Sequence, residues 1–145
     1  MITVKLALSL LQDSSTITVF FVCSMRSTLL WSNSSPTSNF SAQVITLSDN
    51  LSNYDYISLT WCSSKSNTSK TLTAMLKISD FMNSKNVTNG ISVQAGSYGS
   101  ASSAAYSRTV GYDTDSTVAF GNALGLGTSN NNAYSIPLSV HGLKL

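Results

Sequence analysis

Charged side chains are scarce in this chain of 145 residues, and their scarcity excludes several classes of function. Asp, Glu, Lys and Arg make up 10% of the residues, against about 25% in an average soluble protein, and there is no Glu. The 8 Lys and Arg residues are scattered along the chain and leave a net charge of +2. Nucleic acids and anionic membranes need a concentrated basic face, so we expect neither as a partner. A weakly charged surface also gives little repulsion between copies, which favours self-association.

Groups that perform catalysis or bind metals are equally scarce. His141 is the only histidine, so a catalytic triad or a His-based metal site lacks its usual composition. Asp113 and Asp115 stand two apart in a predicted turn, but an EF-hand calcium loop needs further ligands, a central Gly and a closing Glu. The glycines at 121, 125 and 127 precede a run of Asn, not the Lys-Ser/Thr of a phosphate-binding loop. We therefore expect no enzymatic activity, no cofactor and no metal.

The chain also has few cysteines and no long apolar run. Cys23 and Cys62 are too few for a disulfide framework, and both lie in apolar, strand-like runs. Buried free thiols are the favoured interpretation, and a single bridge between the two is the alternative. Polar residues at 12–15 divide the apolar N-terminal region into halves far shorter than the ~20 residues that cross a membrane. We expect neither a signal peptide nor a transmembrane span.

Apolar runs with strict alternation, separated by Ser, Thr and Asn, are what the sequence has in abundance. It contains 29 Ser, 15 Thr and 12 Asn, and its alternation has the period of half-buried strands. Pro137, inside the last run, places that strand at an edge or at a bulge. The pattern predicts an all-β fold, an antiparallel, jelly-roll-like β-sandwich of about ten short strands, with one weak helical candidate at 79–86. The predicted strands cover 1–10, 16–23, 28–31, 43–47, 54–61, 71–79, 91–95, 104–110, 116–120 and 135–145.

A candidate ligand surface consists of tyrosines with Asn and Asp neighbours outside the predicted strand interiors. Aromatic rings stack on sugars, and amides and carboxylates supply hydrogen bonds, so this combination is typical of glycan-binding surfaces. The alternative is that the same tyrosines pack between subunits or lie on a plain surface. The candidates are Tyr98, Tyr112, Asp113, Asp115, Asn130, Asn131, Asn132 and Tyr134.

Several landmarks occur in a fixed order between residue 28 and the end of the chain. The landmarks are Leu30, Trp31, Asn33, Pro36, Phe40, Ala42 and Gln43, then Tyr54 and Asp55, then Arg108, Thr109 and Val110, then Phe120 and Gly121, and finally Ile136, Pro137, Gly142 and Lys144. In this order and composition the sequence resembles the C-terminal β-rich domains of bacteriophage tail-fibre, minor structural and receptor-binding proteins, especially those of phages and prophages of Gram-positive bacteria.

The resemblance implies a protein of the virion surface, in the tail or on the head, that recognises the host cell. Residues 28–145 would form the β-sandwich domain, and residues 1–27 would attach it to the virion or form oligomers. Implied partners are further copies of the chain, with a trimer as the family's usual state, other virion proteins and a host-surface glycan. Two other functions remain open, namely a capsid or tail decoration protein without a ligand and a non-catalytic carbohydrate-binding module.

Overall fold

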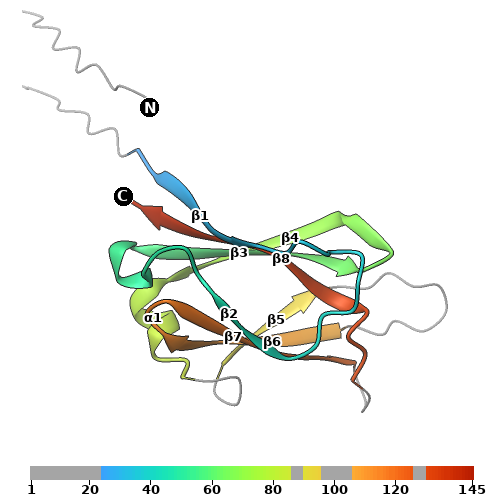
Figure 1. Cartoon of the computed structure of the whole chain (residues 1–145). Coiled ribbons are helices and arrows are strands. Elements are labelled where there is room, and N and C mark those ends of the chain that lie inside the picture. Colours follow the sequence, from blue (N-terminus) through green and yellow to red (C-terminus); the bar gives the residue numbers. More distant parts are fainter. Residues whose placement is uncertain (1–23, 86–89, 96–105, 126–129) are drawn as a thin grey trace, which may run out of the picture.

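Two antiparallel β-sheets face each other in the computed structural model of this chain (Figure 1). The structure describes residues 24–85, 90–95, 106–125 and 130–145. The strands are β1 (Arg26–Ser32), β2 (Gln43–Thr46), β3 (Tyr56–Ser64), β4 (Asn67–Lys77), β5 (Ile91–Ala95), β6 (Tyr106–Thr114), β7 (Thr117–Gly125) and β8 (Tyr134–Lys144). Sheet A has the strand order β1-β8-β3-β4, and sheet B has the order β2-β7-β6-β5.

Helices contribute little to this fold. The described residues contain one 3-10 helix, η1 (Leu51–Asn53), and one α-helix, α1 (Ile78–Met82), which overlaps the predicted helical segment at 79–86. Neither helix of the described part is long and apolar enough to cross a membrane.

The sequence-based prediction of an all-β sandwich is confirmed, with one correction to the number of strands. The described residues contain eight strands instead of about ten, and the two remaining predicted strands, at 1–10 and 16–23, lie outside the described residues. The pairing of β1 with β8 and of β2 with β7 makes the topology jelly-roll-like. It departs from a regular jelly roll because β3 and β4 form a hairpin within one sheet instead of crossing to the other.

Alternation along the strands places one apolar row of each sheet in the core. In β3, Ile57 and Leu59 are buried, whereas Ser58 and Thr60 lie half-exposed on the outer face of sheet A. Burying one Leu, Ile, Val or Phe side chain stabilises the fold by about 1.5–3 kcal/mol, so this inner layer is the main source of stability. The largest members of the core are Leu30, Phe40, Ile45, Leu47, Leu51, Ile57, Leu59, Trp61, Ile78, Phe81, Val110, Val118, Phe120, Ile136 and Val140.

Pro137 lies at a bulge within a central strand. The register between β3 and β8 shifts between Thr60 and Trp61, where Trp61 faces Pro137. Of the two predicted positions, the bulge is therefore correct and the edge is wrong, since β8 lies between β1 and β3. The Nδ2 atom of Asn33 donates a hydrogen bond of 2.9 Å to the Pro137 carbonyl, which anchors the chain after β1 to this bulge.

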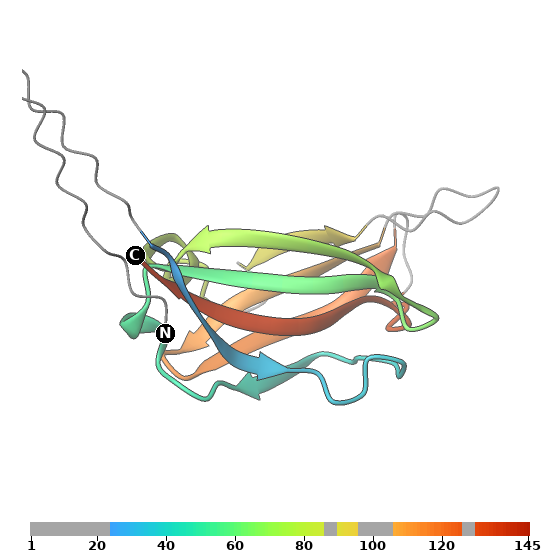
Figure 2. The ribbon, with the colours of Figure 1, turned by 90° about the horizontal axis from the view of Figure 1, so that it is seen from above.

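The sandwich has two ends of different composition (Figures 1 and 2). The terminal end contains the start of β1, the end of β8, η1, α1 and the turn between β6 and β7. The distal end contains the turn between β3 and β4 and the starts of β6 and β8. The C-terminus and the entry of the chain into β1 thus share one end, and the distal end faces away from both.

Candidate functional site at the distal end

The predicted ligand residues do not form one surface. Tyr112, Asp113 and Asp115 lie at or near the β6–β7 turn of the terminal end. The residues 130–132 and Tyr134 lie at the distal end, beside the start of β8. Tyr98 lies outside the described residues. Only the distal group combines a tyrosine ring with a cluster of asparagines, so it remains the candidate site.

The two aspartates of the terminal end hold local structure. Asp115 accepts hydrogen bonds from the backbone N–H of Ser52 at 2.8 Å and from its hydroxyl at 2.7 Å, which fixes η1 against the β6–β7 turn. Asp113 accepts a hydrogen bond of 2.8 Å from the Thr117 hydroxyl across the same turn. Tyr112 is half-buried and packs against the core. Carboxylates engaged in this way act as turn caps.

A pair of stacked tyrosine rings marks the distal end. The rings of Tyr106 and Tyr134 are 4.0 Å apart between centroids, with an interplanar angle of 1°. Gly125 faces Tyr106 in the register of β6 and β7, and a Cβ atom there would lie 3.0 Å from the Tyr106 ring. The glycine therefore gives the ring room to lie flat. Tyr106 escaped the sequence-based prediction because it lies in a strand, where the sequence alone does not reveal which partner its ring meets.

The three predicted asparagines have different tasks. The Oδ1 atom of Asn132 accepts a hydrogen bond of 3.0 Å from the Ala123 N–H, and its Nδ2 atom donates one of 2.9 Å to Asn122. Its amide group thus ties the chain before β8 to β7. Asn131 is exposed, and its side chain accepts a bond of 3.3 Å from the Ala133 N–H within a turn. Asn130 is exposed as well, and Asn131 belongs to the turn that leads into β8, where the Tyr134 N–H donates a hydrogen bond of 3.1 Å to the Asn131 carbonyl.

Charge is distributed unevenly between the two ends. All aspartates of the described residues belong to the terminal end: Asp49, Asp55, Asp80, Asp113 and Asp115. The described part of the distal end contains no carboxylate, and Lys65 lies in its β3–β4 turn. No group of three His, Cys, Asp or Glu side chains within the described ranges has the arrangement of a metal site. The described part of the distal end therefore offers stacking and hydrogen bonding and contains no pair of acids of the kind that glycosidases use.

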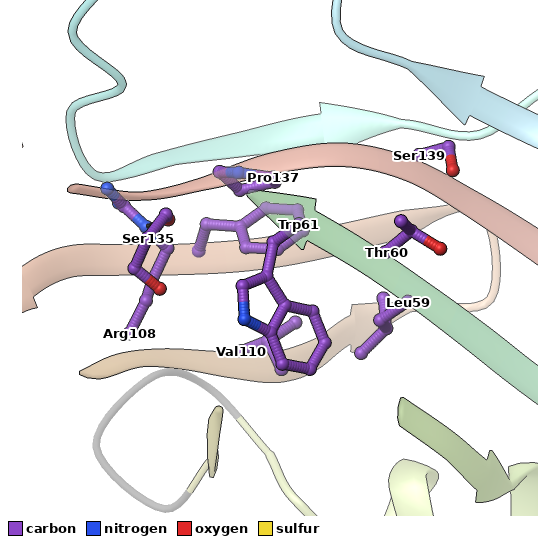
Figure 3. A pocket seen from close by; sticks show the side chains of 9 residues that line it. Leu59, Thr60, Trp61, Arg108, Val110, Ser135, Pro137 and Ser139 are labelled. Carbon is purple, nitrogen blue, oxygen red and sulfur yellow. Dashed lines mark hydrogen bonds between the residues drawn. The ribbon is translucent and has the colours of Figure 1, made fainter. Parts of the chain in front are cut away.

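A small cavity lies between the sheets below this surface (Figure 3). Its volume is about 10 Å³, the lower limit for one water molecule and far too small for a sugar ring. The indole N–H of Trp61 and the hydroxyl of Ser135 line it, and both are buried without a hydrogen-bond partner among the described residues. The cavity is a packing feature, so a ligand of the distal end would bind on the surface.

Arg108 connects the elements that support the distal end. Its side chain is 2% exposed and donates from Nε to the Ser135 carbonyl at 2.8 Å and from Nη2 to the carbonyls of Phe40 and Tyr134 at 2.8 and 3.3 Å. Its Nη1 donates to the Gly121 carbonyl, and the guanidinium lies 5.1 Å from the centroid of the Phe40 ring. Burial lowers the pKa of Arg108 to about 10, so the group stays charged at neutral pH.

A second group of contacts, at the terminal end, joins the start of β3 to the end of β8. The Tyr54 ring covers Gly142, where a Cβ atom would lie 2.5 Å from the ring. The next residue, Asp55, accepts hydrogen bonds from the Leu145 N–H at 2.9 Å and from Lys144 at 3.3 Å. These bonds hold the pKa of Asp55 below its usual 3.8, with the Leu145 amide as the larger cause. Several landmarks of the sequence thus contact one another and stabilise the fold: Arg108 with Phe40 and Gly121, Tyr54 with Gly142, and Asp55 with Lys144.

The core cysteine behaves as a small apolar side chain. Cys62 is buried as a free thiol, with its Sγ atom 3.5 Å from the Ser64 carbonyl. Its expected alternative partner, Cys23, lies outside the described residues.

Comparison of the chain with protein-family models gives no match, and comparison with curated proteins gives none either. The landmarks and the geometry of the distal end are therefore the basis for a function.

Proposed function

We propose that this chain is a non-catalytic structural protein of a bacteriophage virion, tail-fibre-like or spike-like, whose distal end binds a glycan of the host cell surface. The observation that carries the proposal is the stacked pair of Tyr106 and Tyr134 beside the exposed amides of Asn130 and Asn131. An aromatic face with neighbouring amides matches the apolar faces and hydroxyl groups of a sugar. The order of the landmarks supports a virion protein that self-associates, as a trimer, and contacts other virion proteins.

The position of this surface supports a role in attachment. The chain enters β1 at the terminal end, and the distal end lies at the opposite end of the sandwich. A domain held through its N-terminal region would therefore present the tyrosine pair outward. Loops at one end of a rigid sandwich are common positions for binding groups.

A decoration or assembly protein without a ligand is the second candidate. Leu29 and Met75 are large apolar residues that lie on the outer face of sheet A, outside the core, where they are 52% and 54% exposed. Exposed large apolar side chains of this kind favour protein contacts over sugar contacts.

Binding to isolated bacterial cell walls tests the proposal. Fluorescently labelled protein is titrated onto purified cell walls of Gram-positive bacteria, with and without soluble wall polysaccharide as competitor. We expect saturable, competable binding that Tyr134→Ala reduces about five- to 150-fold, because stacking one ring on a ligand contributes about 1–3 kcal/mol. Tyr134→Phe keeps the ring and should bind nearly as wild type. Tyr56→Ala, a half-exposed tyrosine outside the distal end, is the matched control.

Each outcome separates the candidates. Binding that is equal in wild type, Tyr134→Ala and Tyr56→Ala would contradict a distal site. Absence of binding to any wall, combined with addition of the protein to virions that lack it, would make the chain a decoration protein. Glycan binding without incorporation into virions would favour a carbohydrate-binding module. Circular dichroism of each variant shows that lost binding is not lost folding.

A further inference from the structure

Four strands lie at the edges of the two sheets, and three of them are poorly suited to pair with another chain. β2 and β5 have four and five residues. β1 is interrupted by a bulge between Leu29 and Trp31, and the Leu30 carbonyl at its outer edge accepts a bond of 2.9 Å from the Ser48 N–H. Short strands, bulges and covered edges are the usual protection against edge-to-edge association.

The fourth edge, β4, is long and regular. β4 has 11 residues, and its segment Thr71–Lys77 pairs with β3 without any bulge. Within the described residues no strand pairs with its other side. Met75 and Leu72 on this segment are 54% and 48% exposed. A long edge whose regular segment carries a single charge, Lys77, is a template for one more strand.

The side-chain pattern of this segment fits a second copy of itself. Leu72, Ala74 and Leu76 face inward, because they stand opposite the core residues of β3, and the residues between them face outward. Two antiparallel copies related by a two-fold axis at Ala74 overlap over the whole regular segment. Inward residues then meet inward residues, and no two lysines stand opposite each other. The pairs are Thr71 with Lys77, Leu72 with Leu76, Thr73 with Met75, and Ala74 with itself.

We propose that two copies of this chain associate through antiparallel pairing of β4 about a two-fold axis at Ala74. The pairing extends sheet A into one continuous sheet of eight strands, in the order β1-β8-β3-β4-β4-β3-β8-β1. It covers the half-exposed Leu72 with Leu76 of the second copy. A register shifted by one residue would place inward residues of one copy opposite outward residues of the other, so side-chain alternation excludes it. Shifts by two residues keep the alternation but shorten the overlap of the regular segment, which is complete only with the axis at Ala74.

Charge reversal at one pair tests the register. Thr73 and Met75 are exposed and outward-facing, so substitutions there leave the core intact. The double variant Thr73→Lys, Met75→Lys sets lysines opposite each other twice across the axis, and we expect it to halve the mass in solution. The double variant Thr73→Glu, Met75→Lys sets Glu opposite Lys twice, and we expect the wild-type mass to return. Ser58→Lys, on the outer face of sheet A away from the edge, should leave the mass unchanged.

Sedimentation equilibrium of the full chain, over a range of protein concentrations, gives these masses. The halving is expected for a dimer and also for a hexamer in which β4 joins two of the proposed trimers. Three results would overturn the proposal: a wild-type monomer at the highest soluble concentration, a mass that the two lysines do not change, or a mass that the Glu and Lys pair does not restore. Any of them would show that two copies of the chain do not pair through β4 in this register.

Discussion

Replacing Arg108 by methionine is the substitution whose effect follows most directly from the structure. Methionine has a similar length and an apolar stem, so Arg108→Met retains much of the packing against Phe40. It removes the hydrogen bonds that the Arg108 side chain donates to the carbonyls of Phe40, Gly121, Tyr134 and Ser135. These acceptors belong to the loop after β1, to β7 and to the start of β8, so one side chain supports three separate segments.

The expected loss is large for a single residue. Hydrogen bonds to a charged donor contribute about 1.5–3 kcal/mol each, but removing the charge also relieves its desolvation cost. A buried carbonyl left without a donor costs about 1–3 kcal/mol, and the relieved desolvation of the charge offsets part of the sum, so we expect the free energy of unfolding of Arg108→Met to fall by about 3–5 kcal/mol. At about 2–4 °C per kcal/mol, the melting temperature should fall by roughly 6–20 °C. Arg108→Lys keeps the charge but not the planar set of donors, so it should fall in between.

Urea denaturation followed by tryptophan fluorescence measures this loss. Arg26→Met, at the exposed start of β1, is the control and should change the free energy of unfolding by no more than about 0.5 kcal/mol. An Arg108→Met protein within about 1 kcal/mol of wild type would refute the reasoning, because the four carbonyls would then need no donor from Arg108.

Two further substitutions test the terminal end. Gly142→Ala places a Cβ atom 2.5 Å from the Tyr54 ring and should lower the free energy of unfolding by about 1–3 kcal/mol. In a Tyr54→Ala background the same change should have little effect, and a full penalty there would contradict the contact. Asp55 has a lowered pKa, so its contribution is present above pH 3.8 and lost as the pH falls through its folded-state pKa. The urea midpoints of wild type and Asp55→Asn should therefore differ at neutral pH and converge in acid, and a constant difference would contradict this.

The fold was predictable because strand periodicity is a local property. The alternation of Leu72, Ala74 and Leu76 with polar residues is visible without any partner strand, and each predicted strand within the described ranges has a counterpart in the structure. The pairing was not predictable. Whether β4 remains in the sheet of β3 depends on contacts between distant segments, which no local pattern records. Pro137 illustrates what the sequence predicts and what it leaves open. Its missing N–H implied an irregularity in the strand, but it did not distinguish a bulge from an edge position.

The candidate site was predictable only in part. Tyr134 and the neighbouring asparagines could be selected because they lie outside the predicted strand interiors, where a tyrosine has Asn or Asp neighbours. Tyr112 was selected by the same rule, yet the long β6 carries it to the opposite end of the molecule from Tyr106. The prediction therefore placed Tyr112 and Tyr134 on one surface, although they lie at opposite ends of the sandwich. Conversely, Tyr106 and Tyr134 are 28 residues apart in sequence and meet only because β6 and β8 begin at the same end.

The choice of acceptors around Arg108 has a consequence for behaviour in acid. Backbone carbonyls do not titrate and Arg108 stays charged below its pKa of about 10, so the network beneath the distal end keeps its full set of hydrogen bonds in acid as long as the chain stays folded. At the terminal end, by contrast, Asp49 accepts a hydrogen bond from Tyr54 and Asp55 accepts one from the Leu145 N–H, and these bonds hold the pKa of both carboxyls below their usual value. Acidification should therefore loosen the molecule progressively from the end where the chain enters, while the surface that carries the tyrosine pair keeps its shape longest.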